Sequence, residues 1–229
     1  MSADLRTGER RTTADAVFDQ LLDEIVSLSL TPGTKLSEVD VAKRFGVSRQ
    51  PVRDAFNRLS NMELLVVRPQ KATEVRGFSL DRIQDARFIR LAVELEVLRN
   101  ACDRWDKMKA ARLAENLELQ RRCVETSDPD TMRALDYAFH KLICELSGCA
   151  SAFDTILAQK QKVDRLCVLG YEKKARELSV VLGDHERIAR ALKAKSVERV
   201  TAAARTHFSR LDETIKDIHR THAAYFEHQ

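Results

Sequence analysis

The 229-residue chain lacks long apolar runs and has little glycine or proline. No segment approaches the roughly 18 consecutive apolar residues of a membrane-spanning helix. The polar residues 1–13 contain no apolar stretch for a signal peptide. Seven glycines and four prolines interrupt a chain rich in Ala, Leu, Glu, Arg and Lys, a composition typical of helices. The sequence therefore predicts a mainly α-helical, cytoplasmic protein with no membrane partner.

The five cysteines show no pairing pattern, because they are scattered and contain no C-x-x-C motif. An odd, scattered set favours reduced thiols over disulfides or a cysteine metal site. The cysteines are Cys102, Cys123, Cys144, Cys149 and Cys167.

Charge is uneven along the chain, although the net charge of +4 is too small to indicate nucleic acid by itself. Between Ala42 and Arg76 there are eight Lys or Arg residues and three acidic ones. This local excess is where a nucleic-acid surface is expected.

A change of character near residues 77–80 divides the chain into two predicted domains. We expect a disordered tail at 1–13, a first domain at 14–77 and a second, all-helical domain at 78–229. In the first, helical patterns are followed by extended runs at 64–68 and 73–75, which predict a β-hairpin. In the second, a six-helix bundle is expected, with helices at about 80–104, 107–126, 130–147, 150–169, 173–194 and 197–226.

Residues 37–59 have the pattern of a helix-turn-helix. Small Ala42 permits a close helix crossing, and Gly46 can adopt the left-handed conformation of a sharp turn. The second helix has one apolar stripe at helical spacing, made of Val52, Ala55, Phe56 and Leu59. With the hairpin that follows, three helices and two strands predict a winged helix-turn-helix.

A second face of this helix is polar. Arg49, Arg53 and Asn57 recur at i+4 steps, so they share a face that can enter the major groove. An arginine there reads guanine O6 and N7 through two hydrogen bonds. A helical hairpin with solvated arginines is the alternative, which the neighbouring basic hairpin disfavours. The predicted DNA-binding residues are Lys43, Arg44, Ser48, Arg49, Gln50, Arg53, Asn57, Gln70 and Lys71.

This region resembles the GntR family of bacterial repressors. The resemblance is carried by Pro32-Gly33-x-x-Leu36-Ser37, by Val47-Ser48-Arg49-x-Pro51-Val52-Arg53-x-Ala55 and by Leu59. It implies that Arg49 and Arg53 are recognition-helix arginines. Two family glycines are missing, one in the turn at Glu63 or its neighbour and one at the wing tip near Ala72. Contacts of Gln70 and Lys71 with phosphates are still expected.

Three histidines and an aspartate are placed to face inward in the second domain. Asp136 and His140 are one turn apart on one helix face, while His185 and His207 each lie in an apolar stripe. A lone inward histidine is ordinarily a core residue. Three with an aspartate form a ligand set suited to Zn²⁺, Ni²⁺ or Mn²⁺, so the sequence predicts one divalent-metal site.

The same pattern resembles the FCD ligand-binding domain of the FadR subfamily of GntR regulators. Asp136-x-x-Phe139-His140, Asp184-His185-x-x-Ile188 and His207 agree with the metal-binding signature of that domain in order and spacing. Arg90-x-x-x-Glu94 agrees with an element whose arginine faces the cavity, so the resemblance implies effector binding by Arg90 and Glu94. Six helices rather than seven are similar to the shorter, VanR-like branch.

These observations predict a transcriptional repressor whose operator affinity is controlled by a small organic acid bound at the metal site. One helix-turn-helix reads few base pairs, so a homodimer on a palindromic double-stranded operator is expected. Its contact should lie mainly in the helical domain, with the helix at 80–104 contributing.

Two alternatives remain open from the sequence. The divalent ion itself is the signal in the first. The second, more remote, is a metal-dependent hydrolase, because a metal with open positions can activate water. The sequence has no nucleophile motif, phosphate loop or convincing general base, which disfavours an enzyme.

Overall fold

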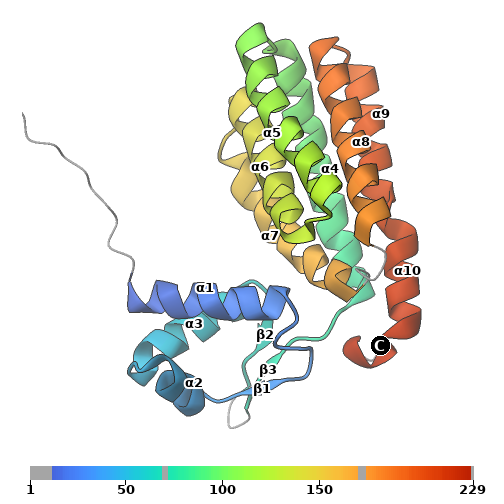
Figure 1. The fold of residues 1–229 in the computed structure, drawn as a ribbon. Coiled ribbons are helices and arrows are strands. Elements are labelled where there is room, and N and C mark those ends of the chain that lie inside the picture. Colours follow the sequence, from blue (N-terminus) through green and yellow to red (C-terminus); the bar gives the residue numbers. More distant parts are fainter. Residues whose placement is uncertain (1–11, 69–71, 170–173, 228–229) are drawn as a thin grey trace, which may run out of the picture. The chain divides into compact units, whose positions relative to one another are not determined.

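A computed structural model describes residues 12–68, 72–169 and 174–227 of the chain (Figure 1). The chain divides into two compact units: the residues up to Phe78 together with Glu227, and Ser79–Phe226. None of the described helices is both long and apolar enough to cross a membrane.

The N-terminal unit contains three helices whose starts are set by polar caps: α1 (Thr13–Val26), α2 (Glu38–Phe45) and α3 (Arg49–Asn61). Thr12 and Asp15 form a reciprocal capping box at α1. This is why Thr12 and Thr13, which were placed in the predicted tail, instead cap and begin a helix. Gly46 ends α2 with a φ of 65°, in the left-handed region that favours glycine. The helix-turn-helix therefore has the predicted turn.

A three-stranded antiparallel sheet completes this unit: β1 (Lys35–Leu36), β2 (Leu65–Val66) and β3 (Thr73–Val75), in the order β1-β3-β2. The predicted hairpin is present as β2 and β3, with Val66 opposite Glu74. The short strand β1 was not predicted; it pairs Leu36 with Thr73. The unit is therefore a winged helix-turn-helix.

The core of this unit is the predicted apolar stripe of α3 packed against α1 and the sheet. Phe56 and Leu59 are buried with Leu21 and Ile25 of α1 and Leu65 of β2. Since this stripe faces the core, the polar face of α3 is left on the surface.

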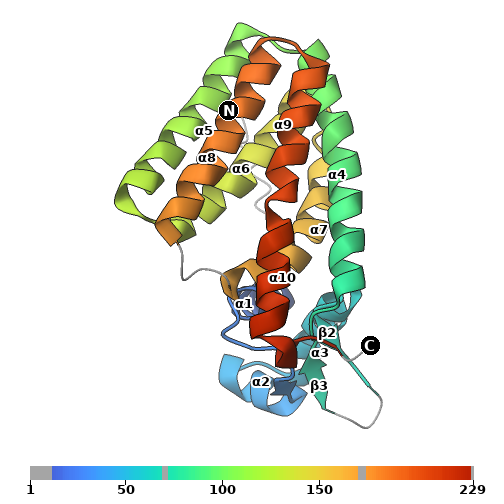
Figure 2. The ribbon, with the colours of Figure 1, turned by 90° about the vertical axis from the view of Figure 1, so that its right-hand side faces the viewer.

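The C-terminal unit is all-helical. Its helices are α4 (Leu80–Asp103), α5 (Lys107–Thr126), α6 (Pro129–Ser147), α7 (Ala152–Cys167), α8 (Lys174–Lys193), α9 (Val197–Ser209) and α10 (Leu211–Thr221), followed by a 3₁₀ turn at Ala223–Tyr225. Helix α4 packs against α6, α7 and α9, while α5 packs against α6 and α8 (Figure 2). Side chains from α4, α5, α6, α8 and α9 thus meet in one interior.

The last predicted helix, 197–226, is two helices, because the chain breaks at Arg210. Arg87 of α4 donates to the carbonyl of Phe208 at 3.1 Å, and an uninterrupted helix would use this carbonyl for the N–H of Asp212. The same guanidinium pairs with the Asp212 carboxylate at 2.5 Å. A side chain inserted into the helical ladder bends or breaks a helix. The described part of this unit therefore has seven α-helices rather than six, and helix number no longer favours the shorter branch.

Candidate functional site

The surface of α3 presents the residues predicted to contact DNA. Arg49, Gln50, Arg53 and Asn57 are exposed, and Gln50 donates to Asp54 one turn along at 2.9 Å. Ser48 occupies the N-cap of α3, but its hydroxyl makes no capping hydrogen bond within the described chain. On this surface, both arginines and the Ser48 hydroxyl face solvent.

The two arginines predicted to contact bases, Arg49 and Arg53, are held by one carboxylate that sequence reasoning missed. Glu38, the first residue of α2, accepts hydrogen bonds from Arg53 Nε at 3.1 Å and Arg53 Nη2 at 3.0 Å. It also accepts one from Arg49 Nη2 at 2.9 Å. The hydrogen bonds from Arg53 and then Arg49 lower the pKa of Glu38 to about 2, so it is ionised. A guanidinium held along its Nε edge keeps its Nη1 end for another acceptor.

The remaining predicted DNA-binding residues lie elsewhere. Lys43 and Arg44 are exposed on α2, and Arg44 pairs with Glu24 at 3.0 Å. Gln70 and Lys71, predicted at the wing tip, lie outside the described residues. Ala72 directly precedes β3.

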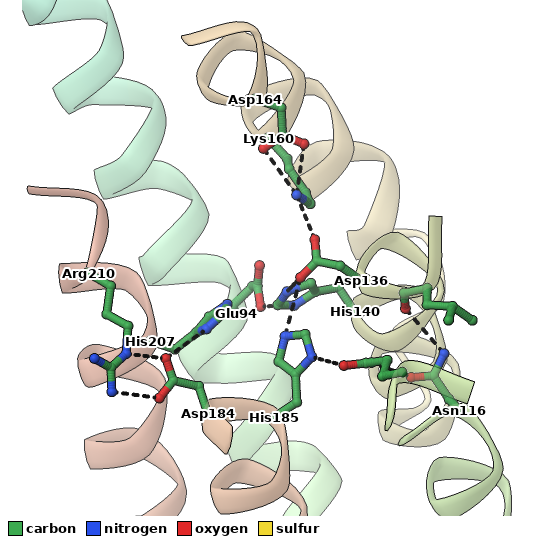
Figure 3. A network of polar contacts seen from close by, with 12 residues as sticks. Glu94, Asn116, Asp136, His140, Lys160, Asp164, Asp184, His185, His207 and Arg210 are labelled. Carbon is green, nitrogen blue, oxygen red and sulfur yellow. Dashed lines mark hydrogen bonds and ion pairs between the residues drawn. The ribbon is translucent and has the colours of Figure 1, made fainter. Parts of the chain in front are cut away.

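In the C-terminal unit, the four predicted metal ligands converge from three helices. Asp136 and His140 come from α6, His185 from α8 and His207 from α9 (Figure 3). Each offers one ligand atom, and these atoms all lie within 4.8 Å of one another. His140 and His185 are buried, while Asp136 and His207 are partly buried. Residues separated by as many as 71 positions are thus brought together in the interior.

A chain of amides fixes the tautomer of His185. The carbonyl of Leu135 can only accept, and it takes a hydrogen bond from Asn116 Nδ2 at 3.2 Å. Asn116 Oδ1 therefore accepts from Gln120 Nε2 at 2.7 Å. Gln120 Oε1 is left to face His185 Nδ1 at 2.8 Å, so Nδ1 must carry the proton. The unprotonated Nε2 of His185 then points the other way.

His185 Nε2 lies 3.3 Å from Asp136 Oδ1. It is buried and has no hydrogen-bond partner among the described residues. Burial, more than any other influence, lowers the pKa of His185 to about 4. A lone pair of the imidazole thus faces a carboxylate oxygen, and two facing acceptors repel unless a positive charge lies between them. This arrangement fits a metal cation.

The other two histidines have a carboxylate oxygen near Nδ1, where His185 has the amide oxygen of Gln120. His140 Nδ1 is 2.7 Å from Glu94 Oε2, and His207 Nδ1 is 3.5 Å from Asp184 Oδ2. An acceptor at one ring nitrogen leaves the other as a ligand atom and is common behind metal-binding histidines. Burial would lower the pKa of His140, but Glu94 and Asp136 raise it; a bound metal would have to displace any proton.

Arg90 and Glu94, predicted to bind effector, are both buried next to His140. Arg90 Nε donates to Glu94 at 2.8 Å, and Arg90 Nη2 lies 3.1 Å from His140 Nε2. The guanidinium also stacks over the ring of Phe208, 4.6 Å from its centre. The structure therefore brings Arg90 into the cluster, with two of its nitrogens engaged by protein atoms.

A buried lysine beside the cluster was also missed. Lys160 of α7 pairs with Asp136 Oδ2 at 2.7 Å and with Asp164 Oδ2 at 2.8 Å. Burial favours the neutral amine, but Asp136 and Asp164 outweigh it and raise the pKa of Lys160. The sequence signal was a polar residue on a core stripe, since Lys160 lies between buried Ile156 and Val163 at spacings of four and three. Gln120 of α5 carries the same signal.

Comparisons with known proteins agree with this architecture. Residues 13–75 match the family model described as "Bacterial regulatory proteins, gntR family", and residues 85–210 match the FCD domain. The chain is 30% identical over 229 residues to the HTH-type transcriptional repressor RspR of Escherichia coli K12, covering all of both proteins. It is 32% identical over 213 residues to an uncharacterised HTH-type regulator of Streptomyces ambofaciens, covering 93% of this chain and 89% of that one.

Solved structures support the fold. The chain matches E. coli McbR/YncC with a TM-score of 0.74 at 22% identity, covering 92% of this chain and 98% of that one. These findings define a DNA-binding transcriptional regulator rather than an enzyme. The chain belongs to the GntR family and carries an FCD domain.

Proposed function

We propose that this regulator is a repressor whose affinity for its operator is controlled by a small organic acid bound at a metal centre in the FCD domain. The observation that carries the metal centre is the approach of His185 Nε2 to Asp136 Oδ1, two acceptor atoms 3.3 Å apart. The repressor assignment is supported by the relative from E. coli K12, which is named a repressor. The site of action is the cytoplasm, where a bacterial regulator meets DNA.

The metal centre consists of Asp136, His140, His185 and His207, which hold one Zn²⁺, Ni²⁺ or Mn²⁺ per chain. Three nitrogens and one oxygen suit each of these ions. Elemental analysis of protein purified without a His tag tests this, with an expected stoichiometry of one ion that His185→Ala abolishes. Protein that contains no metal and takes up none of the three ions would refute the site.

The effector is an organic acid, because its carboxylate can complete the metal shell beside Arg90. A cation at His140 Nε2 competes with the Arg90 Nη2 contact at 3.1 Å, so metal binding frees a guanidinium donor for a carboxylate. A thermal-shift screen of small carboxylates with and without metal tests the idea, since a ligand that binds only the folded state raises the melting temperature. Stabilisation that requires both metal and Arg90 is expected.

A second candidate function is a metal sensor, in which the ion is the signal. The hydrogen bond from Arg90 Nε to Glu94 favours it, because this donor is already used within the protein and is not available to an effector carboxylate. A DNA affinity that changes when metal is added, but does not change with any carboxylate, would support the metal sensor.

The DNA surface is the exposed face of α3, with Arg49 and Arg53 reading base edges. Contacts with the DNA phosphate backbone or with flanking bases come from the other predicted residues. These are Lys43, Arg44, Ser48, Gln50, Asn57, Gln70 and Lys71. Arg53 is the best placed of all the predicted residues, because Glu38 holds its Nε edge and leaves the Nη1 end for guanine.

The active form is a homodimer on a palindromic operator. The proposed contact is the exposed face of α4, where Phe88 is 74% and Ile89 40% exposed. Large apolar side chains at adjacent exposed positions in the middle of a helix are typical of an interface. Sedimentation of the full chain tests the assembly.

A further inference from the structure

The ammonium of Lys160 is saturated by carboxylates. Three carboxylate oxygens surround its Nζ: Asp136 Oδ2 at 2.7 Å, and Asp164 Oδ2 and Oδ1 at 2.8 and 3.1 Å. A lysine has three N–H donors and no acceptor, so this network uses its full capacity. The ammonium therefore has no donor left for an effector, and its role is through its contact with Asp136.

Lys160 gives the two oxygens of Asp136 different surroundings. The outer oxygen, Oδ2, faces the ammonium (Figure 3). The inner oxygen, Oδ1, faces His185 Nε2 at 3.3 Å and His140 Nε2 at 3.6 Å. One oxygen of this carboxylate is thus directed to the histidine cluster, while the other is neutralised outside it.

We propose that Lys160 keeps a coordination position of the metal open for the effector by occupying the outer oxygen of Asp136. The inference rests on the metal centre proposed above. A carboxylate ligates a cation through one oxygen or two. If Asp136 were to chelate, its second oxygen would take a position that an effector carboxylate needs. Lys160 is therefore a positioning residue for effector binding.

The lysine is itself fixed on two further sides. Tyr137 donates its hydroxyl to Asp164 Oδ2 at 2.6 Å, which aligns the carboxylate that faces Lys160. The ammonium also lies 4.3 Å from the centre of the Tyr137 ring, a favourable cation–π distance. These contacts help to hold the ammonium at its place beside Asp136 Oδ2.

The test uses Mn²⁺ as the probe metal and acetate as the probe carboxylate, on the full chain. Water-proton relaxation counts the exchangeable water positions on bound Mn²⁺, and a titration gives the Mn²⁺ affinity. We expect Lys160→Met to bind Mn²⁺ at least as tightly as the parent but to lose about one of roughly two water positions, since an octahedral ion with four protein donors has two left. Acetate affinity should fall about tenfold. This is within the range that is typical when a residue hydrogen-bonded to a metal ligand is substituted.

Controls separate this role from stability and from charge. Lys160→Arg keeps a cation at Oδ2 and should retain the parent water count. Tyr137→Phe removes a hydrogen bond from the same network without freeing Oδ2, so it should also behave as the parent. If Lys160→Met does not fold, Lys160→Met with Asp164→Asn removes one charge of each sign and is measured in its place, with the same expected loss of water.

The outcomes distinguish the two proposals. A parent protein that binds no Mn²⁺, Ni²⁺ or Zn²⁺ overturns the metal centre itself and the inference with it. A parent that binds Mn²⁺ while Lys160→Met shows the same water count and acetate affinity overturns only the role of Lys160.

Discussion

At the residue scale, the proposed DNA surface includes Arg53, whose guanidinium is oriented by hydrogen bonds to Glu38. Losing a bidentate base contact costs about 1–3 kcal/mol, so Arg53→Ala should weaken binding to the operator about tenfold or more. The measurement is a binding titration with a duplex that the protein selects from a random pool, alongside a scrambled duplex.

Arg53→Lys is the matched control, because it keeps the charge but not the planar fork. It should retain affinity for scrambled DNA while losing affinity for the selected duplex. An unchanged ratio of the two affinities in both variants would show that Arg53 reads no base.

The amide chain that ends at His185 makes a second prediction at this scale. Gln120→Leu removes the acceptor of the His185 Nδ1 proton, so the ring loses its preferred tautomer. Metal affinity should fall about 10- to 100-fold, as is typical behind metal-binding histidines. Isothermal titration with Zn²⁺ measures this, and Gln120→Glu, which keeps an acceptor at the same place, should lose less. If Gln120→Leu bound Zn²⁺ as tightly as the parent, the hydrogen bond from His185 Nδ1 to Gln120 would not be what fixes the tautomer.

Residue roles were predictable only where one helix carried the signal. Asp136 and His140 share a helix face, and His185 and His207 interrupt apolar stripes, so their inward direction could be read from spacing. Lys160 and Gln120 also interrupt core stripes, but the partners that connect them to the cluster, Asp136 and His185, lie on other helices. Glu38 precedes Arg53 by 15 positions, and nothing in its spacing predicts the pair.

At the element scale, the turn of the helix-turn-helix depends on Gly46. With its φ of 65°, an added Cβ meets no atom within 4 Å among the described residues, so only backbone strain opposes a side chain there. The left-handed region costs a non-glycine residue roughly 1–2 kcal/mol. Gly46→Ala should lower the stability of the N-terminal unit by about that amount, measured by denaturant unfolding.

Zn²⁺ affinity serves as the control for this variant, because the proposed metal ligands lie in the other unit and their affinity should not change. If the free energy of unfolding of Gly46→Ala equalled that of the parent, Gly46 would not adopt the left-handed conformation in the turn.

The starts of helices that have a polar N-cap and a periodic apolar stripe were predicted to within about one residue. Strand β1 and the break between α9 and α10 have neither signal and were missed. Helices α5 and α6 begin after Asp106 and Asp128, whose side chains accept from Lys109 and Thr131, as a polar N-cap does. Strand β1 has only two residues, too few for a period. The break at Arg210 lies next to the carbonyl that accepts from Arg87 of α4, a contact that local sequence does not contain.

At the scale of the whole molecule, we expect a dimer. Phe88→Glu places a charge on the exposed face of α4 and should shift the protein toward monomer in sedimentation velocity at micromolar concentration, because an interface centre excludes unpaired charge. Met108→Glu is the control, since Met108 on α5 is equally exposed at 74%. A parent that is monomeric, or a dimer that both variants leave intact, contradicts this surface.

The central claim is that a metal centre and a carboxylate together set DNA affinity. The most direct measurement is the affinity of the full chain for its selected duplex, with and without the carboxylate that stabilises it most. Metal-loaded parent, metal-stripped parent and His185→Ala are compared. The account predicts that the carboxylate changes the affinity of the metal-loaded parent about 5- to 150-fold and leaves the other two unchanged. An equal response with and without metal, or in His185→Ala, would contradict it.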